Sequence, residues 1–215
     1  MKLFRLLCLS ASIALLSLGT AHAGRPLTVD DAGVNDVGAG HVEFWFARMP
    51  QNLDAWTVSP AYSPIKGFEM SAVLSRDQTD RQTTKTIQGK LQLTPTKEVG
   101  CNYAVSFGVG YINETVNKTP YVNGIGTCNS SLGAFHGNVG VSHSDGQNKQ
   151  VNWGVAYEKV IGPVTAHIER YGQETMRPAT QIGMRKEVIP GLQIDGTLGW
   201  YDGYAIYSIG MKKMF

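Results

Sequence analysis

The sequence predicts an all-β fold: a closed, antiparallel β-barrel that crosses a membrane. Hydrophobic and polar residues alternate from residue 41 to the end of the chain, and turn residues interrupt the alternation about every 10 positions. A period of two is typical of strands whose two faces meet different surroundings. The length of 215 residues fits one such domain.

The start of the chain has the features of a secretory signal. Lys2 and Arg5 give it a positive beginning, residues 6–18 an apolar middle, and residues 21–23 (Ala-His-Ala) a small-residue cleavage site. The apolar part, about 13 residues, is too short to cross ~30 Å of hydrocarbon as a helix. We therefore expect a cleaved signal peptide at residues 1–23 and export of the chain.

The alternation favours a barrel whose apolar side faces lipid. A soluble β-sandwich would alternate as well, with its apolar sides turned inward. Here the polar faces are rich in Gly, Ala and Ser, which suits a crowded lumen, and the apolar faces carry aromatic residues near strand ends, as the girdles of membrane barrels do. These aromatic residues are Trp56, Phe68, Tyr103, Tyr111, Trp153 and Trp200.

The last strand gives this prediction a bacterial context. Tyr207, Ile209 and Met211 share one face with Phe215, the final residue. An exported chain that ends in an alternating strand with an aromatic terminus resembles bacterial outer-membrane β-barrels. The resemblance implies a place in the outer membrane, contact with its lipid, and Phe215 as the assembly signal for the barrel-assembly machinery.

The number of strands follows from parity. Bacterial single-chain barrels have an even number of strands, short periplasmic turns and longer outer loops. Residues 116–131 are long for one loop, so we interpret residues 120–127 as a short returning strand. This gives a barrel of 12 strands in residues 41–215, with 10 strands as the alternative. The eleven clearer segments begin near residues 41, 55, 68, 82, 103, 131, 150, 164, 178, 192 and 204.

Two cysteines, Cys101 and Cys128, remain after removal of the signal. An even pair in an exported protein is most simply a disulfide. Two sulfurs without a nearby pair of histidines fall short of a zinc site. In the 12-strand arrangement both cysteines lie at the periplasmic end of one hairpin, where a bond would close a loop of about 28 residues and contribute ~3 kcal/mol.

Residues 24–40 alternate poorly and contain Pro and Gly, so we expect a leader rather than a membrane strand. The stretch from Pro26 to Gly33 reads Pro-Leu-x-x-Asp-Asp-Ala-Gly, and Gly38, Gly40 and Glu43 follow. Over these residues the chain resembles a family of outer-membrane transporters named for the phenol-degradation meta pathway (Phenol MetA-like). The resemblance implies transport of small molecules, with hydrophobic or aromatic solutes.

The leader contains Asp30 and Asp31, for which three interpretations stay open. The carboxylates could pair with cations as the leader folds into the pore, bind a metal cation, or form an Asx-type turn. A carboxylate in a low-dielectric lumen gains more from a cation than it would in open solvent. We expect the leader to plug the periplasmic mouth, with Asp30 or Asp31 facing Lys90, Arg185 or Lys212.

The inward faces of the predicted strands carry charged residues. Burial of an isolated charge is costly, so these residues must be paired or hydrated. A salt-bridged, solid barrel and a narrow polar pore both fit, since twelve strands fall between filled small barrels and open porins. The inward candidates are Glu43, Glu69, Lys90, Glu158, His167, Glu169, Arg185, Asp195 and Lys212.

Catalysis is not indicated by the sequence. His143-Ser144-Asp145 is the one cluster that invites a triad, but neighbours on a strand point to opposite faces, so we interpret it as a polar turn. No phosphate loop, nucleophile elbow or metal cluster occurs, and we expect no cofactor and no bound metal.

Charge argues against a nucleic-acid partner. The 19 basic residues include two in the signal, Lys2 and Arg5, against 17 acidic residues, so the exported chain is formally neutral. We predict a passive channel or transporter for small molecules. The alternative is a non-conducting structural or adhesive barrel, with a lipid-acting outer-membrane enzyme as a distant third.

Overall fold

The architecture comes from a computed structural model that describes residues 26–50, 53–79, 81–112 and 118–215. The predicted signal peptide, residues 1–23, lies outside the described residues. So does the tip of the hairpin that holds the two cysteines, residues 113–117. Within the described ranges, no helix has the length and apolar character needed to span a bilayer.

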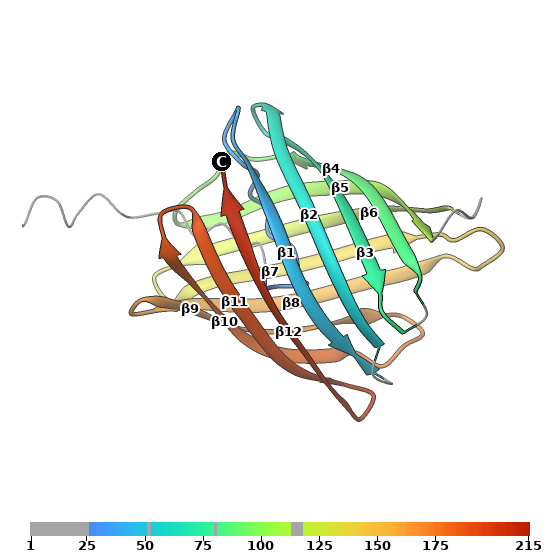
Figure 1. Cartoon of the computed structure of the whole chain (residues 1–215). Helices are drawn as coiled ribbons and strands as arrows, with labels where there is room; N and C mark the ends of the chain where they lie inside the picture. Colours follow the sequence, from blue (N-terminus) through green and yellow to red (C-terminus); the bar gives the residue numbers. More distant parts are fainter. Residues whose placement is uncertain (1–25, 51–52, 80, 113–117) are drawn as a thin grey trace, which may run out of the picture.

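Twelve antiparallel strands form a closed barrel, in which β1 pairs with β12 and every other pair joins neighbours in sequence (Figure 1). The prediction of 12 strands is confirmed, and the alternative of 10 is wrong. Both ends of the barrel lie at one mouth, the terminal mouth; the opposite end is the distal mouth. The strands are β1 (Gly40–Met49), β2 (Leu53–Ile65), β3 (Phe68–Asp77), β4 (Thr83–Gln92), β5 (Gly100–Ile112), β6 (Lys118–Ser130), β7 (Gly133–Ser142), β8 (Gln150–Ile161), β9 (Val164–Gln173), β10 (Ala179–Ile189), β11 (Leu192–Tyr201) and β12 (Tyr204–Met214).

The strand β6 is longer than predicted. It has 13 residues, whereas the sequence predicted a short strand over residues 120–127, and it pairs with β5 over almost its whole length. The residues that the prediction left out include Lys118 and Ser130 on the outward face and Thr119 and Asn129 on the inward face. Because these residues are polar on both faces, the alternation does not mark the two ends of β6.

The two faces of the wall differ as the alternation predicts. On β5, Asn102 and Ala104 are buried toward the lumen, whereas Tyr103 and Phe107 are 51% and 46% exposed on the outside. The same alternation continues around the barrel and leaves large apolar side chains exposed on every strand. Soluble monomers rarely expose a continuous apolar surface of this extent. The outer wall is therefore suited to the hydrocarbon of a bilayer.

The barrel closes where its two ends meet. Gly40 and Phe215 exchange two backbone hydrogen bonds, each 2.9 Å long, in which each N–H donates to the other residue's carbonyl. A Cβ at position 40 would lie 2.7 Å from the ring of Phe215. A glycine at position 40 therefore leaves the space that the terminal aromatic ring occupies over the seam.

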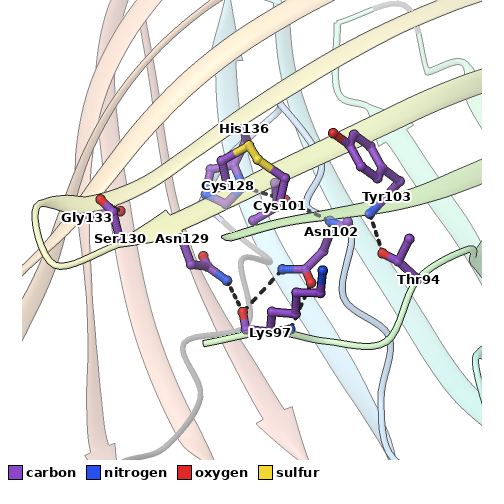
Figure 2. Close-up of a disulfide and its surroundings, with 12 residues drawn as sticks. Thr94, Lys97, Cys101, Asn102, Tyr103, Cys128, Asn129, Ser130, Gly133 and His136 are labelled. Atoms are coloured by element: carbon purple, nitrogen blue, oxygen red, sulfur yellow. Dashed lines mark hydrogen bonds between the residues drawn. A yellow bond between two sulfur atoms is a disulfide. The ribbon is translucent and has the colours of Figure 1, made fainter. Parts of the chain in front are cut away.

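The predicted disulfide between Cys101 and Cys128 is present (Figure 2), with a sulfur–sulfur distance of 2.04 Å. The two residues are direct partners across β5 and β6, with their Cα atoms 4.0 Å apart. Beside them, the carbonyl of Lys97 accepts hydrogen bonds from the side-chain amides of Asn102 and Asn129. The segment between β4 and β5 is thereby fixed to both strands of the hairpin.

Candidate functional site

Residues 26–39, which we call the leader from here on, run inside the barrel. Gly40, the last residue of the predicted leader, belongs to β1. The leader has no regular secondary structure, and its Val29 and Ala32 are only 2% and 1% exposed. Ala32 packs with Ala104 and Ile125, which face the lumen from β5 and β6. The leader thus forms part of the interior of the barrel.

Glu169 of β9 holds the first part of the leader. Its carboxylate accepts hydrogen bonds from the backbone N–H groups of Thr28, at 2.9 Å, and Val29, at 2.8 Å. The side-chain amide of Gln181, on the neighbouring strand β10, donates to the same carboxylate. Glu169 is 1% exposed, so a fully buried carboxylate is satisfied by N–H donors, two of which belong to the leader.

Two polar side chains of the wall continue this attachment through the leader backbone. Asn138 of β7 accepts a hydrogen bond from the N–H of Asp30 at 2.7 Å and donates to its carbonyl at 2.8 Å. The hydroxyl of Thr127 on β6 accepts from the N–H of Ala32 at 2.9 Å. Buried backbone groups need such partners because an unmade hydrogen bond is expensive. The wall therefore supplies what an irregular segment cannot supply for itself.

Lys90 of β4 is the cation that meets the leader. Its ammonium lies 2.7 Å from Oδ1 of Asp30 and donates to the carbonyls of Asp31 and Gly33, both at 3.2 Å. Of the three cations that the sequence offered as partners for the Asp pair, the structure brings this one to the leader.

Asp31 has a different environment from Asp30. Its Oδ1 accepts a hydrogen bond from the N–H of Gly33, and its own N–H donates to Oδ1 of Asp30, as in an Asx-type turn. Burial raises the pKa of the Asp31 carboxyl above its usual value, against the opposing effect of Lys90. Turn formation and pairing with a lumen cation therefore occur together at this aspartate pair.

The end of the leader is attached near the terminal mouth. The N–H of Asn35 donates to Glu69 of β3 at 3.0 Å, and its side chain lies within hydrogen-bond distance of Nδ1 of His41. Further on, the N–H of Gly38 donates to the carbonyl of Ser63, at the end of β2. The leader is thus bonded to the barrel wall from Thr28 to its junction with β1.

The other predicted cations pair with the wall. Arg185 lies 2.8 Å from Glu158, whose carboxylate is also 3.7 Å from His136. Lys212 lies 3.8 Å from Glu43. The remaining two candidates are buried at lumen positions: His167 opposite Glu158 on β8, and Asp195 opposite Arg185 on β10. The charged residues form separate groups. Those around Lys90, Glu69 and Glu169 bond the leader directly, and the Glu43–Lys212 group meets it through His41, which lies 3.8 Å from Glu43 and contacts Asn35.

Within the described residues, three cavities of the lumen are lined in part by the leader. One of about 540 Å³ lies between the leader and the wall around β1. A second, of about 470 Å³, is at the distal mouth and has Thr28 and Val29 in its lining. The third, of about 410 Å³, is at the terminal mouth and includes Asp31, Ala32 and Gly33. The leader therefore separates the two mouth cavities and leaves space along one side of the barrel.

Several residues of this site were missed by the sequence reasoning. Asn138, Thr127 and Gln181 hold the leader, and Tyr121 and Tyr171 line both the cavity beside the leader and the distal one. All five face the lumen in the same alternation as the charged candidates. The alternation could have identified them, but only the cost of burying charge was used to select candidates.

The predicted polar turn is present at residues 143–145. The hydroxyl of Ser144 lies 2.8 Å from that of Thr119, and the carboxylate of Asp145 accepts a hydrogen bond from the N–H of Lys118. These contacts join the turn to the start of β6. Among the residues that the structure describes, no three His, Cys, Asp or Glu side chains are grouped as a metal site would need.

Comparison with protein families gives a match to the family described as "Uncharacterised conserved protein UCP029691", over residues 11–200. The match covers most of the chain, so the chain belongs to this family. The resemblance to the phenol-degradation transporters stays a prediction. A search of curated proteins finds no match.

Solved structures with the same architecture include several porins. The KdgM porin aligns with a TM-score of 0.66 at 11% identity, over 81% of this chain and 99% of that one. The COG4313 outer membrane channel from Pseudomonas putida F1 aligns with a TM-score of 0.65 at 8% identity, over 86% of this chain and 98% of that one. The NanC porin aligns with a TM-score of 0.61 at 8% identity, over 81% of this chain and 98% of that one. At these identities the likeness shows a shared fold.

Proposed function

We propose that this member of the family is a passive channel for small molecules in the bacterial outer membrane, narrowed by its own leader. The cavity of about 540 Å³ beside the leader carries the proposal. Its lining includes His41, near the start of β1, and Met49, at the end of that strand. The space therefore extends from near the terminal mouth toward the distal mouth.

The lining of this cavity indicates a preference for cations. The leader contributes Asp30 and Asp31, and the wall contributes the acids Glu43 and Glu69 and the bases Lys90 and Lys212. Because the acids outnumber the lysines, the field in the passage attracts positive charge. We expect small cations to pass faster than anions.

The distal cavity supports the finer proposal of hydrophobic or aromatic solutes, which the resemblance to the phenol-pathway family also implies. Its lining includes Tyr121, Tyr171 and Ile206 from the wall and Val29 from the leader. Apolar and aromatic walls with a few amides are typical of sites for small organic molecules. A solute entering there would meet the leader before it reached the cavity beside β1.

The same proposal assigns the orientation. Bacterial barrels of this kind have both ends in the periplasm, so the terminal mouth, with Gly40 and Phe215, would face the periplasm. The barrel-assembly machinery would then recognise the last strand, and outer-membrane lipid would surround the apolar wall. The solute enters from the distal mouth.

Conductance in planar bilayers and uptake of a labelled solute into liposomes test the channel. Ser71 lines the cavity beside the leader, whereas the next residue, Ala72, points outward from the same strand. Ser71→Trp should reduce both conductance and uptake severalfold, and Ala72→Trp should leave both unchanged. If the wild-type protein passes neither ions nor solutes, and deletion of the leader opens no path, the channel proposal is wrong and the structural-barrel alternative is favoured.

A further inference from the structure

An apolar groove crosses the outer face of the barrel, away from the lumen. It has a volume of about 510 Å³ and is lined by Val164, Met184, Gly196, Ile209, Phe44 and Trp56, from strands β9 to β12, β1 and β2. Gly196 is paired with Met184 on one side and Ile209 on the other. The missing side chain between these two long ones accounts for the hollow.

One end of the groove is basic. Lys186 lines the groove and is exposed on β10. Lys213, exposed on β12, is the direct partner of Leu192, and its ammonium lies 3.4 Å from the carbonyl of Pro190 in the turn between β10 and β11. Glu187, near the end of β10, accepts a hydrogen bond from the N–H of Gly191 in this turn. Two exposed lysines thus lie toward the terminal mouth, one on β10 and one on β12.

We propose that this groove binds an anionic phospholipid of the leaflet at the terminal mouth. One acyl chain lies across Gly196 between Met184 and Ile209, and the phosphate contacts Lys186 and Lys213. Charge complementarity selects this occupant, since each lysine at a membrane surface favours anionic lipid by about fivefold. The inference rests on the proposed membrane location, which places the terminal mouth in the phospholipid leaflet.

Trp56 provides a probe inside the groove, because a brominated acyl chain quenches the fluorescence of a tryptophan that it touches. The protein is reconstituted in phosphatidylcholine bilayers with increasing amounts of dibrominated phosphatidylglycerol or dibrominated phosphatidylcholine. The Trp56 signal is the difference between the wild type and Trp56→Phe. The two lysines contribute about fivefold each, so we expect half-quenching at an about 25-fold lower fraction of the anionic lipid. Equal quenching by the two lipids overturns the proposal.

Variants distinguish the contribution of the lipid headgroup from that of the acyl chain. The double variant K186Q/K213Q should abolish the preference, whereas Lys85→Gln, at an exposed position on β4, should keep it. Gly196→Leu should fill the groove and reduce quenching by both lipids. A Cβ at position 196 meets its nearest atom at 3.5 Å, so this side chain fits, and Gly124→Leu on β6 is the matched control at 3.6 Å.

Three other outcomes would overturn the lipid proposal or the channel proposal on which it rests. A preference that survives K186Q/K213Q overturns the proposal. Weak quenching that increases when the protein is diluted in the membrane also overturns it, since a second copy of the chain would then cover the groove. If no lipid quenches any tryptophan, the protein is not embedded, and the proposed membrane channel fails instead.

Discussion

The ammonium of Lys90 joins three acceptors of the leader: Oδ1 of Asp30 at 2.7 Å and the carbonyls of Asp31 and Gly33 at 3.2 Å. Lys90 is 7% exposed, so it has exchanged water for these oxygens. A buried lysine needs such partners to remain charged. The attachment of the leader and the burial of this wall cation therefore depend on one another.

Asp30→Asn should loosen the leader. The change removes the charge opposite Lys90 and weakens a charge-assisted hydrogen bond, at a cost of about 2 kcal/mol, or about a 30-fold change in the docking equilibrium. Faster amide exchange at Thr28 and Val29 in the folded protein would report it. Asp31→Asn is the control. Burial already favours the neutral form of Asp31 by raising its pKa, and an amide oxygen still accepts from Gly33. Equal exchange rates in the two variants would contradict this account.

Two buried carboxylates should give opposite results when removed. Glu169→Ala removes the acceptor of the N–H groups of Thr28 and Val29. Amide hydrogen exchange in the leader should therefore accelerate, and channel conductance should rise.

Glu158→Ala removes the carboxylate that lies 2.8 Å from the buried guanidinium of Arg185. The barrel should then lose about 3 kcal/mol of stability, which would lower the temperature at which heating shifts its gel mobility. Amide hydrogen exchange in the leader should be unchanged. If the two variants behave alike, the leader and the wall are not separate units.

The fold could be predicted because barrel strands repeat one simple rule. Each strand from Gly40 to Met214 alternates between a lipid-facing and a lumen-facing side, and parity corrected the count where the pattern was weak. The length of β6 was underestimated because its ends carry polar residues on both faces, among them Lys118, Asn129 and Ser130. Alternation depends on a contrast between the two faces of a strand, so it does not mark strand ends that lack this contrast.

The arrangement within the lumen was harder to predict. The nine inward candidates of the sequence analysis are all buried, because the period of two by itself decides which face of a strand a residue lies on. Which cation meets Asp30 depends on how far the leader enters and on shear around the barrel, and neither is encoded locally. Asn138 and Thr127 bind the leader through its backbone, and such contacts leave no trace in the pattern of charges.

Gly154→Ala tests the position of the leader by a purely steric change. A Cβ at position 154 of β8 would lie 2.7 Å from Cγ2 of Val29, closer than two carbon atoms can approach. The added methyl should therefore displace the first part of the leader without changing any charge. Amide exchange at Thr28 should accelerate, and conductance should increase. Gly110→Ala, whose Cβ would meet its nearest atom at 3.4 Å, is the lumen-facing control and should leave both unchanged.

Replacing Cys101 and Cys128 together by Ser should lower stability without opening the barrel. The bond joins residues 27 apart in sequence, and losing it releases a loop whose closure contributes ~3 kcal/mol. The pairs on either side, Gly100 with Asn129 and Asn102 with Thr127, remain to hold β5 against β6. The urea midpoint in detergent micelles, followed by tryptophan fluorescence, should fall while the heat-modifiable gel mobility persists. The wild type under reductant should match the variant.

Alkylation of freshly isolated wild type without reductant should label neither cysteine, and two labelled thiols would reject the bond.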